Sequence, residues 1–108
     1  MLDALFFGAH PDDVELTAGG LAAQLAGQGW RVGIADLTRG EAGTRGDVAV
    51  RAAEAAAAAR ELGVAWRESL GLPDLGLDRR DRAQQGAVVA CLREHRPRLV
   101  VAPDADDV

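Results

Sequence analysis

Apolar runs and helix-period patterns alternate along this chain. Two segments, residues 2–8 and 31–37, are largely apolar, as is typical of strands that are buried on both faces of a sheet. Weaker strand patterns cover residues 64–70 and 99–102. These four segments are predicted to form the strands of the fold.

Three helices are predicted between these strands. Apolar side chains recur at helical spacing over residues 14–28, 48–62 and 83–95. Gly63 follows the second of these segments and suits the left-handed position that ends many helices. Pro97 follows the third segment. Because proline is not tolerated inside a helix, the third helix is expected to end before it.

The regular alternation of strand and helix predicts an α/β, Rossmann-like three-layer fold with a mainly parallel sheet. In such sheets, ligands bind beyond the carboxyl ends of the strands. The polar segments AHPDDVE, TRGEAGTRGD, GLPDLGLDRR and PDADD each follow one of the four predicted strands. We therefore expect these polar segments to lie together at one edge of the sheet.

Composition narrows the functional classes. A length of 108 residues allows one domain with a modest core, and 48% hydrophobic with 27% charged residues is ordinary for a globular protein. No run approaches the roughly 20 apolar residues that cross a membrane, and the first residues lack the basic region of a secretory signal. The net charge of −5 argues against nucleic acid as a partner, and the single cysteine, Cys91, fits a reducing cytoplasm.

The segment GAHPDDVE, residues 8–15, has two interpretations. Pro11 and any one of the acids would suit the first turn of a helix. Helix capping does not explain why His10 and two adjacent carboxylates, Asp12 and Asp13, follow the first strand at the edge of the sheet where ligands bind. An imidazole and a carboxylate are good partial ligands for Zn²⁺, so His10 and Asp13 could hold a metal while Asp12 acts as a general base.

Other polar residues support alternative interpretations. Arg39, Glu41 and Arg45, after the second predicted strand, could bind substrate hydroxyls or a carboxylate, or could belong to a merely flexible charged loop. Asp36 stands where dinucleotide-binding folds place an acid against a ribose, but the first loop has no G-x-G-x-x-G pattern, so nucleotide binding has little support. Packing roles are expected for four residues: Trp30, Trp66, Cys91 and His95.

Four segments together resemble a known family. AHPDDVE, LTRGEAGTRGD, RAAEAAAAARELGV and LGLPDLGL, in this order, closely resemble the LmbE-like or PIG-L family of zinc-dependent N-acetylglucosamine deacetylases. The resemblance runs from Leu5 to Pro103 and implies that residues 1–108 are the N-terminal part of a single deacetylase domain. TRGEAGTRG is most similar to the bacillithiol-biosynthesis branch, whose substrate is N-acetylglucosaminyl malate. The mycothiol and diacetylchitobiose branches remain open.

The resemblance assigns roles to individual residues. His10 and Asp13 match the first two zinc ligands of the family, and Asp12 matches its general base, which activates the water that attacks the acetamide. Arg51 matches an arginine that contacts the sugar. Glu15, one turn into the first helix, is expected to support these residues rather than to react.

The resemblance also leaves a gap in the site. In the family, the third zinc ligand comes from an HPDH-type segment after the fourth strand, where this sequence has PDADDV. Asp104, Asp106 and Asp107 could lend an oxygen, but a frayed chain end is favoured. The 108 residues alone are therefore expected to bind zinc weakly and to turn over little substrate.

Two hypotheses follow for the function. The first is a metal-dependent hydrolase that releases acetate from a small N-acetylated amino sugar, without nucleic-acid or membrane partners. The second is a non-catalytic sugar- or metal-binding module, or an inactive fragment that lacks the third metal ligand. Unpaired strand edges recruit partners, so a homo-oligomer is a further expectation.

Overall fold

The predicted order of strands and helices is confirmed. A computed structural model describes residues 1–42 and 47–103. The strands are β1 (Ala4–Gly8), β2 (Val32–Thr38), β3 (Trp66–Leu72) and β4 (Leu99–Val101). The helices are α1 (Asp13–Gly27), α2 (Val48–Leu62) and α3 (Arg82–His95), and a short 3-10 helix, η1 (Asp74–Gly76), follows β3.

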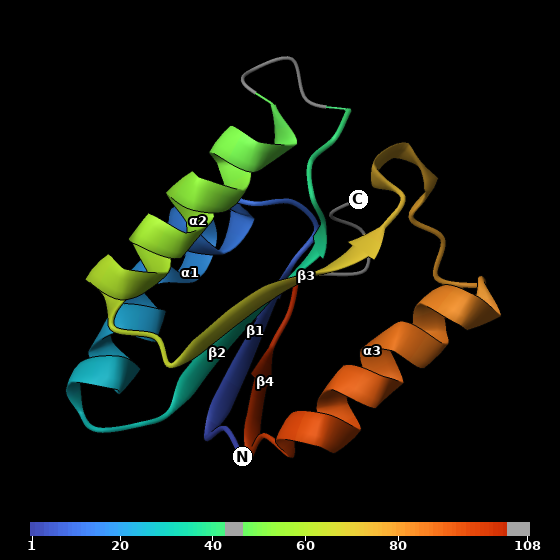
Figure 1. The fold of residues 1–108 in the computed structure, drawn as a ribbon. Coiled ribbons are helices and arrows are strands. Elements are labelled where there is room, and N and C mark those ends of the chain that lie inside the picture. Colours follow the sequence, from blue (N-terminus) through green and yellow to red (C-terminus); the bar gives the residue numbers. More distant parts are fainter. Residues whose placement is uncertain (43–46, 104–108) are drawn as a thin grey trace.

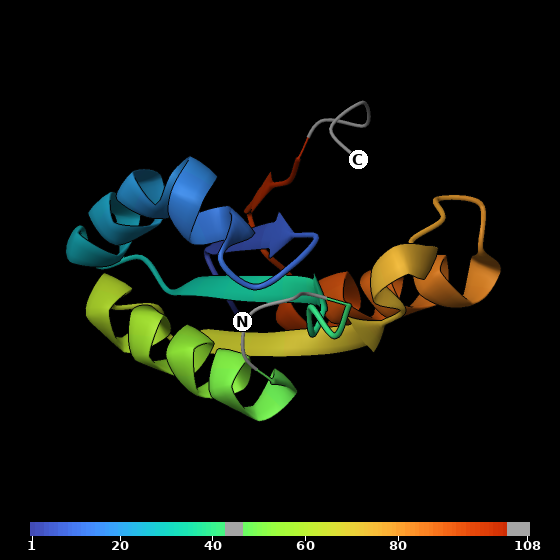
Figure 2. The ribbon, with the colours of Figure 1, turned by 90° about the horizontal axis from the view of Figure 1, so that it is seen from above.

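The sheet has the strand order β3-β2-β1-β4, and each neighbouring pair runs parallel. Helices α1 and α2 cover one face of the sheet and α3 covers the other, as Figures 1 and 2 show from two directions. This is the expected three-layer α/β fold. The loops that follow β1, β2 and β3 leave the sheet at one end, the upper end in Figure 1, which confirms the predicted gathering for the described parts of these three polar segments. Asp104, Asp106 and Asp107 of the fourth segment lie outside the described residues.

Strand β1 is buried on both sides because its side chains alternate between two cores. Ala4 and Phe6 pack with Val14 of α1 on the face that α1 and α2 cover. Leu5 and Phe7 belong to the second core, on the α3 side. Burial on both faces explains why the strand is continuously apolar rather than alternating with polar residues.

The two later helices have the capping groups that helix ends require. The Asp47 carboxylate accepts a hydrogen bond from the Val50 N–H at the start of α2, and Asp81 accepts one from the Gln84 N–H at the start of α3. Gly63 ends α2 with a φ of 77°, the left-handed conformation predicted for it. These caps fix where α2 begins, which determines the position of Arg51 in its first turn.

Strand β3 lies two residues later than predicted. Val64 still bonds to the last turn of α2, through its N–H to the Ala59 carbonyl. The strand then continues through Gly71, which has a φ of 70°, where the register against β2 shifts between Asp36 and Thr38. The chain then continues into η1. A hydropathy pattern does not reveal such a shift in register.

The residues expected to pack are packed. Trp30 lies against the first core, and Cys91 is buried in the second, where burial raises the pKa of its thiol. The rings of Trp66 and His95 lie 4.2 Å apart between centroids, tilted by 49°. Within residues 1–42 and 47–103, no helix combines the length and the apolar character needed to cross a membrane.

Candidate active site

The turn between β1 and α1 has an unusual backbone. Asp12 is the N-cap residue of α1 but has a φ of 82°, and its side chain makes no capping hydrogen bond. A left-handed aspartate is strained unless its surroundings hold it there. Its side chain is 57% exposed. Helix capping therefore does not account for Asp12, whose carboxylate remains accessible from solvent.

His10 and Asp13 lie side by side in this turn. The His10 backbone N–H donates to Asp13 Oδ2 over 3.0 Å. The ring atom Nδ1 of His10 lies 3.4 Å from the same oxygen. Both side chains are about two-fifths exposed, at 43% and 41%, so each retains access to a ligand in the adjoining cleft.

Asp74 joins this pair from a distant loop. Its Oδ1 lies 2.7 Å from His10 Nε2, and its Oδ2 accepts a hydrogen bond of 2.8 Å from the Ala42 N–H. The Asp74 side chain is only 6% exposed. The sequence pattern indicates no role for Asp74 itself, although its segment is predicted to lie at the same sheet edge as His10.

Arg51 reaches the turn from α2. Its Nη2 donates to the Pro11 carbonyl over 3.3 Å and lies 4.0 Å from Asp12 Oδ2. Gly40 passes directly beneath this guanidinium, since a Cβ atom there would lie 2.9 Å from Arg51 Cζ. The fold therefore places the cation beside the candidate base.

A cleft of about 420 Å³ joins these groups. Its lining includes His10, Asp12, Asp13, Arg51 and Asp74. Three carboxylates, one imidazole and one guanidinium thus converge from the loops after β1 and β3 and from α2. Such a site can accept a proton and bind hydroxyl groups.

The candidates in the second loop have different environments. Glu41 Oε2 accepts a hydrogen bond of 2.9 Å from the Asp74 N–H, and this backbone bond lowers the pKa of Glu41. Glu41 therefore holds the η1 segment in place in this structure. Arg39 is exposed and lines a neighbouring pocket. Arg45 lies outside the described residues.

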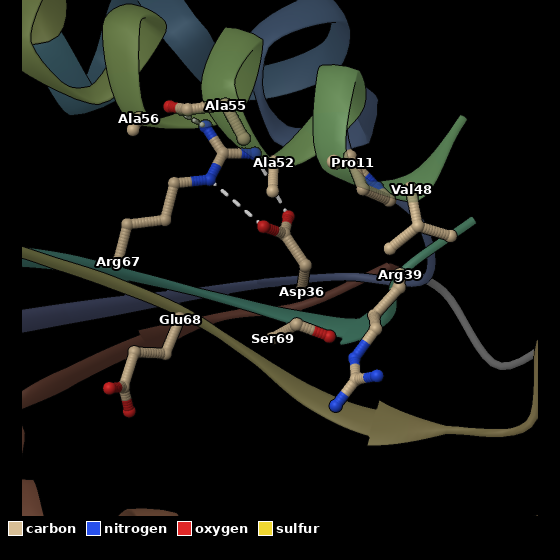
Figure 3. A pocket seen from close by; sticks show the side chains of 11 residues that line it. Pro11, Asp36, Arg39, Val48, Ala52, Ala55, Ala56, Arg67, Glu68 and Ser69 are labelled. Carbon is tan, nitrogen blue, oxygen red and sulfur yellow. Dashed lines mark hydrogen bonds and ion pairs between the residues drawn. The ribbon is translucent and has the colours of Figure 1, made fainter. Parts of the chain in front are cut away.

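The neighbouring pocket, of about 560 Å³, lies between α2 and strands β2 and β3 (Figure 3). Its upper part contains the ion pair of Arg67 and Asp36, and Arg39 extends beside Ser69, away from that pair. Burial raises the pKa of Asp36, and Arg67 opposes this shift through its hydrogen bonds and charge. Because Asp36 is engaged by Arg67, the resemblance of its position to a ribose-binding acid gains no support.

The sequence of this chain matches a known protein family. Residues 5–108 match the PIG-L family, described as GlcNAc-PI de-N-acetylase. The chain belongs to the PIG-L family. A curated relative from Mycobacterium avium, a 1D-myo-inositol 2-acetamido-2-deoxy-alpha-D-glucopyranoside deacetylase, is 35% identical over 93% of this chain and 43% of its own length.

Solved structures with this fold include proteins of more than one activity. The conserved protein TT1542 from Thermus thermophilus has a TM-score of 0.91 and 45% identity, over 96% of this chain and 47% of that chain. N,N'-diacetylchitobiose deacetylase from Pyrococcus horikoshii has a TM-score of 0.86 and 30% identity, over 94% and 40%. GalB, a 4-carboxy-2-hydroxymuconate hydratase from Pseudomonas putida, has a TM-score of 0.77 and 29% identity, over 93% and 46%. The chain thus spans under half the length of each of these proteins.

Two residues of the cleft are of the types that bind zinc. His10 offers an imidazole nitrogen and Asp13 a carboxylate oxygen, both of which Zn²⁺ accepts. Catalytic zinc sites have three protein ligands and an open position. Among residues 1–42 and 47–103, no group of three or more His, Cys, Asp or Glu side chains is arranged to hold a metal. The described residues therefore supply two fitting ligands.

Proposed function

We propose that this protein is a metal-dependent deacetylase that hydrolyses the acetamide of an N-acetylglucosamine derivative and releases acetate. The observation that carries the proposal is the convergence of His10, Asp12, Asp13, Arg51 and Asp74 on one cleft. Membership of the PIG-L family and the two deacetylases among its relatives support the same reaction.

Asp12 is the general base of the proposed reaction. Its carboxylate is exposed and is not consumed by helix capping, so it can accept a proton from a water molecule that attacks the acetamide carbonyl. Collapse of the resulting tetrahedral species breaks the C–N bond, and the proton then passes to the leaving amine. A Zn²⁺ ion held by His10 and Asp13 would polarise the carbonyl and lower the pKa of water.

Asp74 orients His10 for that role. A histidine that binds a metal through one ring nitrogen commonly donates its other N–H to a carboxylate, which fixes the tautomer and the ring. With its proton on Nε2, His10 donates to Asp74 Oδ1 and presents the lone pair of Nδ1 on the side of Asp13. Asp74 is held in turn by the Ala42 N–H, so the ring orientation is set before any ligand binds.

Arg51 binds the sugar. Its guanidinium has donors left over after its bond to the Pro11 carbonyl, and its side chain is 19% exposed at the cleft. Hydroxyl and acetamide oxygens of a glucosaminide are suitable acceptors for these donors.

An acidic aglycone, such as malate, fits the pocket next to the cleft. Pro11 lines both cavities, so a substituent on the sugar can extend from one into the other. Arg39 offers an exposed guanidinium there, which suits a carboxylate. The relatives act on inositol and chitobiose derivatives by name, and Arg39 is the feature that favours a charged aglycone in this chain.

The test is product analysis on the intact protein. We expect equal amounts of acetate and free amine from N-acetylglucosaminyl malate, with slower release from neutral glucosaminides. Hydration of 4-carboxy-2-hydroxymuconate without any acetate release would instead assign the activity of GalB. Saturable sugar binding without product would support the non-catalytic module. A cytoplasmic location and a homo-oligomer remain predictions, to be checked by fractionation and by size-exclusion chromatography.

A further inference from the structure

Arg67 connects four elements of the fold. From β3 it donates to both carboxylate oxygens of Asp36 on β2, with Nε–Oδ2 and Nη2–Oδ1 distances of 2.9 Å each. Its Nη2 and Nη1 lie 3.0 Å from the two carboxylate oxygens of Glu15 on α1. Nη1 also donates to the Ala55 carbonyl of α2 over 3.4 Å. Figure 3 shows the guanidinium between the sheet and α2.

The cluster of Arg67, Asp36 and Glu15 is largely buried and has one more negative than positive group. The side chains of Arg67 and Asp36 are 5% and 4% exposed, and that of Glu15 is 18% exposed. One guanidinium therefore faces two carboxylates away from solvent. Apolar residues of similar volume stabilise a fold at least as well as most buried ion clusters do. Stability alone is thus a weak reason for this arrangement.

The cluster instead determines where the first turn of α1 lies. Glu15 stands in that turn with Asp12 and Asp13, and the turn has no side-chain cap of its own. It is also packed tightly onto β1, because a Cβ atom at Gly8 would lie 3.1 Å from Asp13 Cβ. A fixed anchor on Glu15 can therefore hold the strained Asp12 backbone and the Asp13 carboxylate in register with the sheet.

We infer that Arg67 is a positioning residue, which acts through Glu15 to hold the Asp12–Asp13 turn in its ligand-binding geometry. This inference rests on the proposed function. Arg67 does not line the cleft of His10 and Asp12, although it lines the neighbouring pocket. Its removal is therefore expected to change metal affinity and kcat more than the KM of a neutral glucosaminide, which has no acidic aglycone to enter that pocket. Its effect reaches the site through the backbone of α1.

The experiment compares two variants of the intact protein with wild type. In the first, Arg67→Met leaves two buried carboxylates without their partner. In the second, Arg67→Met, Asp36→Leu and Glu15→Leu together remove every charge of the cluster, so that the fold is kept without the anchor. Arg60→Met, an exposed arginine of α2, is the matched control.

Three measurements decide the inference. We expect the zinc dissociation constant of the triple variant to rise about 10- to 100-fold, as when groups that orient metal ligands are lost. We expect kcat to fall while the KM of a neutral glucosaminide stays within about twofold, and amide hydrogen exchange over residues 9–17 to accelerate. Arg60→Met should change none of these. If the triple variant folds and retains wild-type zinc affinity, kcat and exchange, the positioning role is wrong.

The variants can also fail in a way that separates the two proposals. If Arg67→Met does not fold, the triple variant still answers the question, because it leaves no unpaired charge of this cluster in the protein interior. If wild type releases no acetate, the proposed function fails, while hydrogen exchange over residues 9–17 still tests the anchor. Unchanged exchange in that segment would overturn the inference whatever the activity.

Discussion

His10 Nε2 lies 2.7 Å from Asp74 Oδ1, although the two residues come from loops after different strands. Asp74 is buried while His10 is about half-exposed, so the carboxylate is fixed and the ring is oriented by it. Because β1 and β3 run in the same direction, on either side of β2, their following loops meet at one edge of the sheet. The pair connects the HPDD and PDLG segments of the sequence.

Replacing Asp74 by asparagine should weaken metal binding. The amide keeps the volume of the carboxylate but has no charge and only one acceptor oxygen, so it cannot accept from both the Ala42 N–H and the His10 ring and holds the ring less firmly. We expect the zinc dissociation constant to rise about 10- to 100-fold in an isothermal titration. Asp78→Asn, in the exposed part of the same loop, is the control. Wild-type affinity in Asp74→Asn would contradict the orienting role.

Replacing Arg51 by alanine should raise KM. The side chain contacts the turn and faces the cleft, so its loss removes binding to the sugar in both the ground state and the transition state. We expect KM to rise about tenfold, the equivalent of about 1.4 kcal/mol of binding. Arg60→Ala on the same helix should have no effect. A large fall in kcat with unchanged KM would show that Arg51 acts in the transition state instead.

A pair of glycines separates backbone strain from displacement of Arg51. Gly40 and Gly29 both have a left-handed φ, of 69° and 90°. Alanine at either position should cost about 1–2 kcal/mol in the free energy of unfolding. Only at Gly40 would the new Cβ meet the Arg51 guanidinium, whereas nothing lies within 4 Å of it at Gly29. We therefore expect a raised KM in Gly40→Ala alone, and equal KM values would contradict the tight contact.

Asp36 makes stability depend on pH. Burial raises its pKa above the ordinary 3.8, with Arg67 opposing the shift, so the folded chain binds this proton more tightly than the unfolded chain. The resulting stability is complete below pH 3.8 and is lost as the pH rises through the raised pKa.

The matched variant is Asp36→Asn, which does not titrate at this position. The free energy of unfolding of wild type minus that of Asp36→Asn should therefore fall as the pH rises from about 3 to about 7. Urea unfolding at several pH values measures this difference. A difference that rises with pH would show that Arg67 dominates and lowers the pKa of Asp36.

The fold could be predicted from the sequence because its patterns are local. Apolar runs and helical spacing lie within single elements, and Gly63 signals the end of α2 through its own backbone preference. The sheet edge that gathers the polar loops then follows from parallel topology. His10, Asp12 and Asp13 were accessible to the same reasoning because they are neighbours in the sequence.

The missed features depend on contacts between distant segments. Asp74 looks like an ordinary loop residue until the fold brings it to His10, and Arg67 looks like a surface arginine until it is seen between Glu15 and Asp36. No periodicity encodes these pairs. The left-handed backbone of Asp12 was likewise hidden, because aspartate is also a common helix cap.

The most direct test of the account is acetate release by the intact protein before and after metal removal, in wild type and in Asp12→Asn. We expect chelation to abolish release and Zn²⁺ to restore it in wild type. Asp12→Asn should bind zinc but remain about 10²- to 10⁴-fold slower, the usual contribution of a general base. Acetate release that survives chelation, or that persists at the wild-type rate in Asp12→Asn, would contradict the proposed deacetylase mechanism.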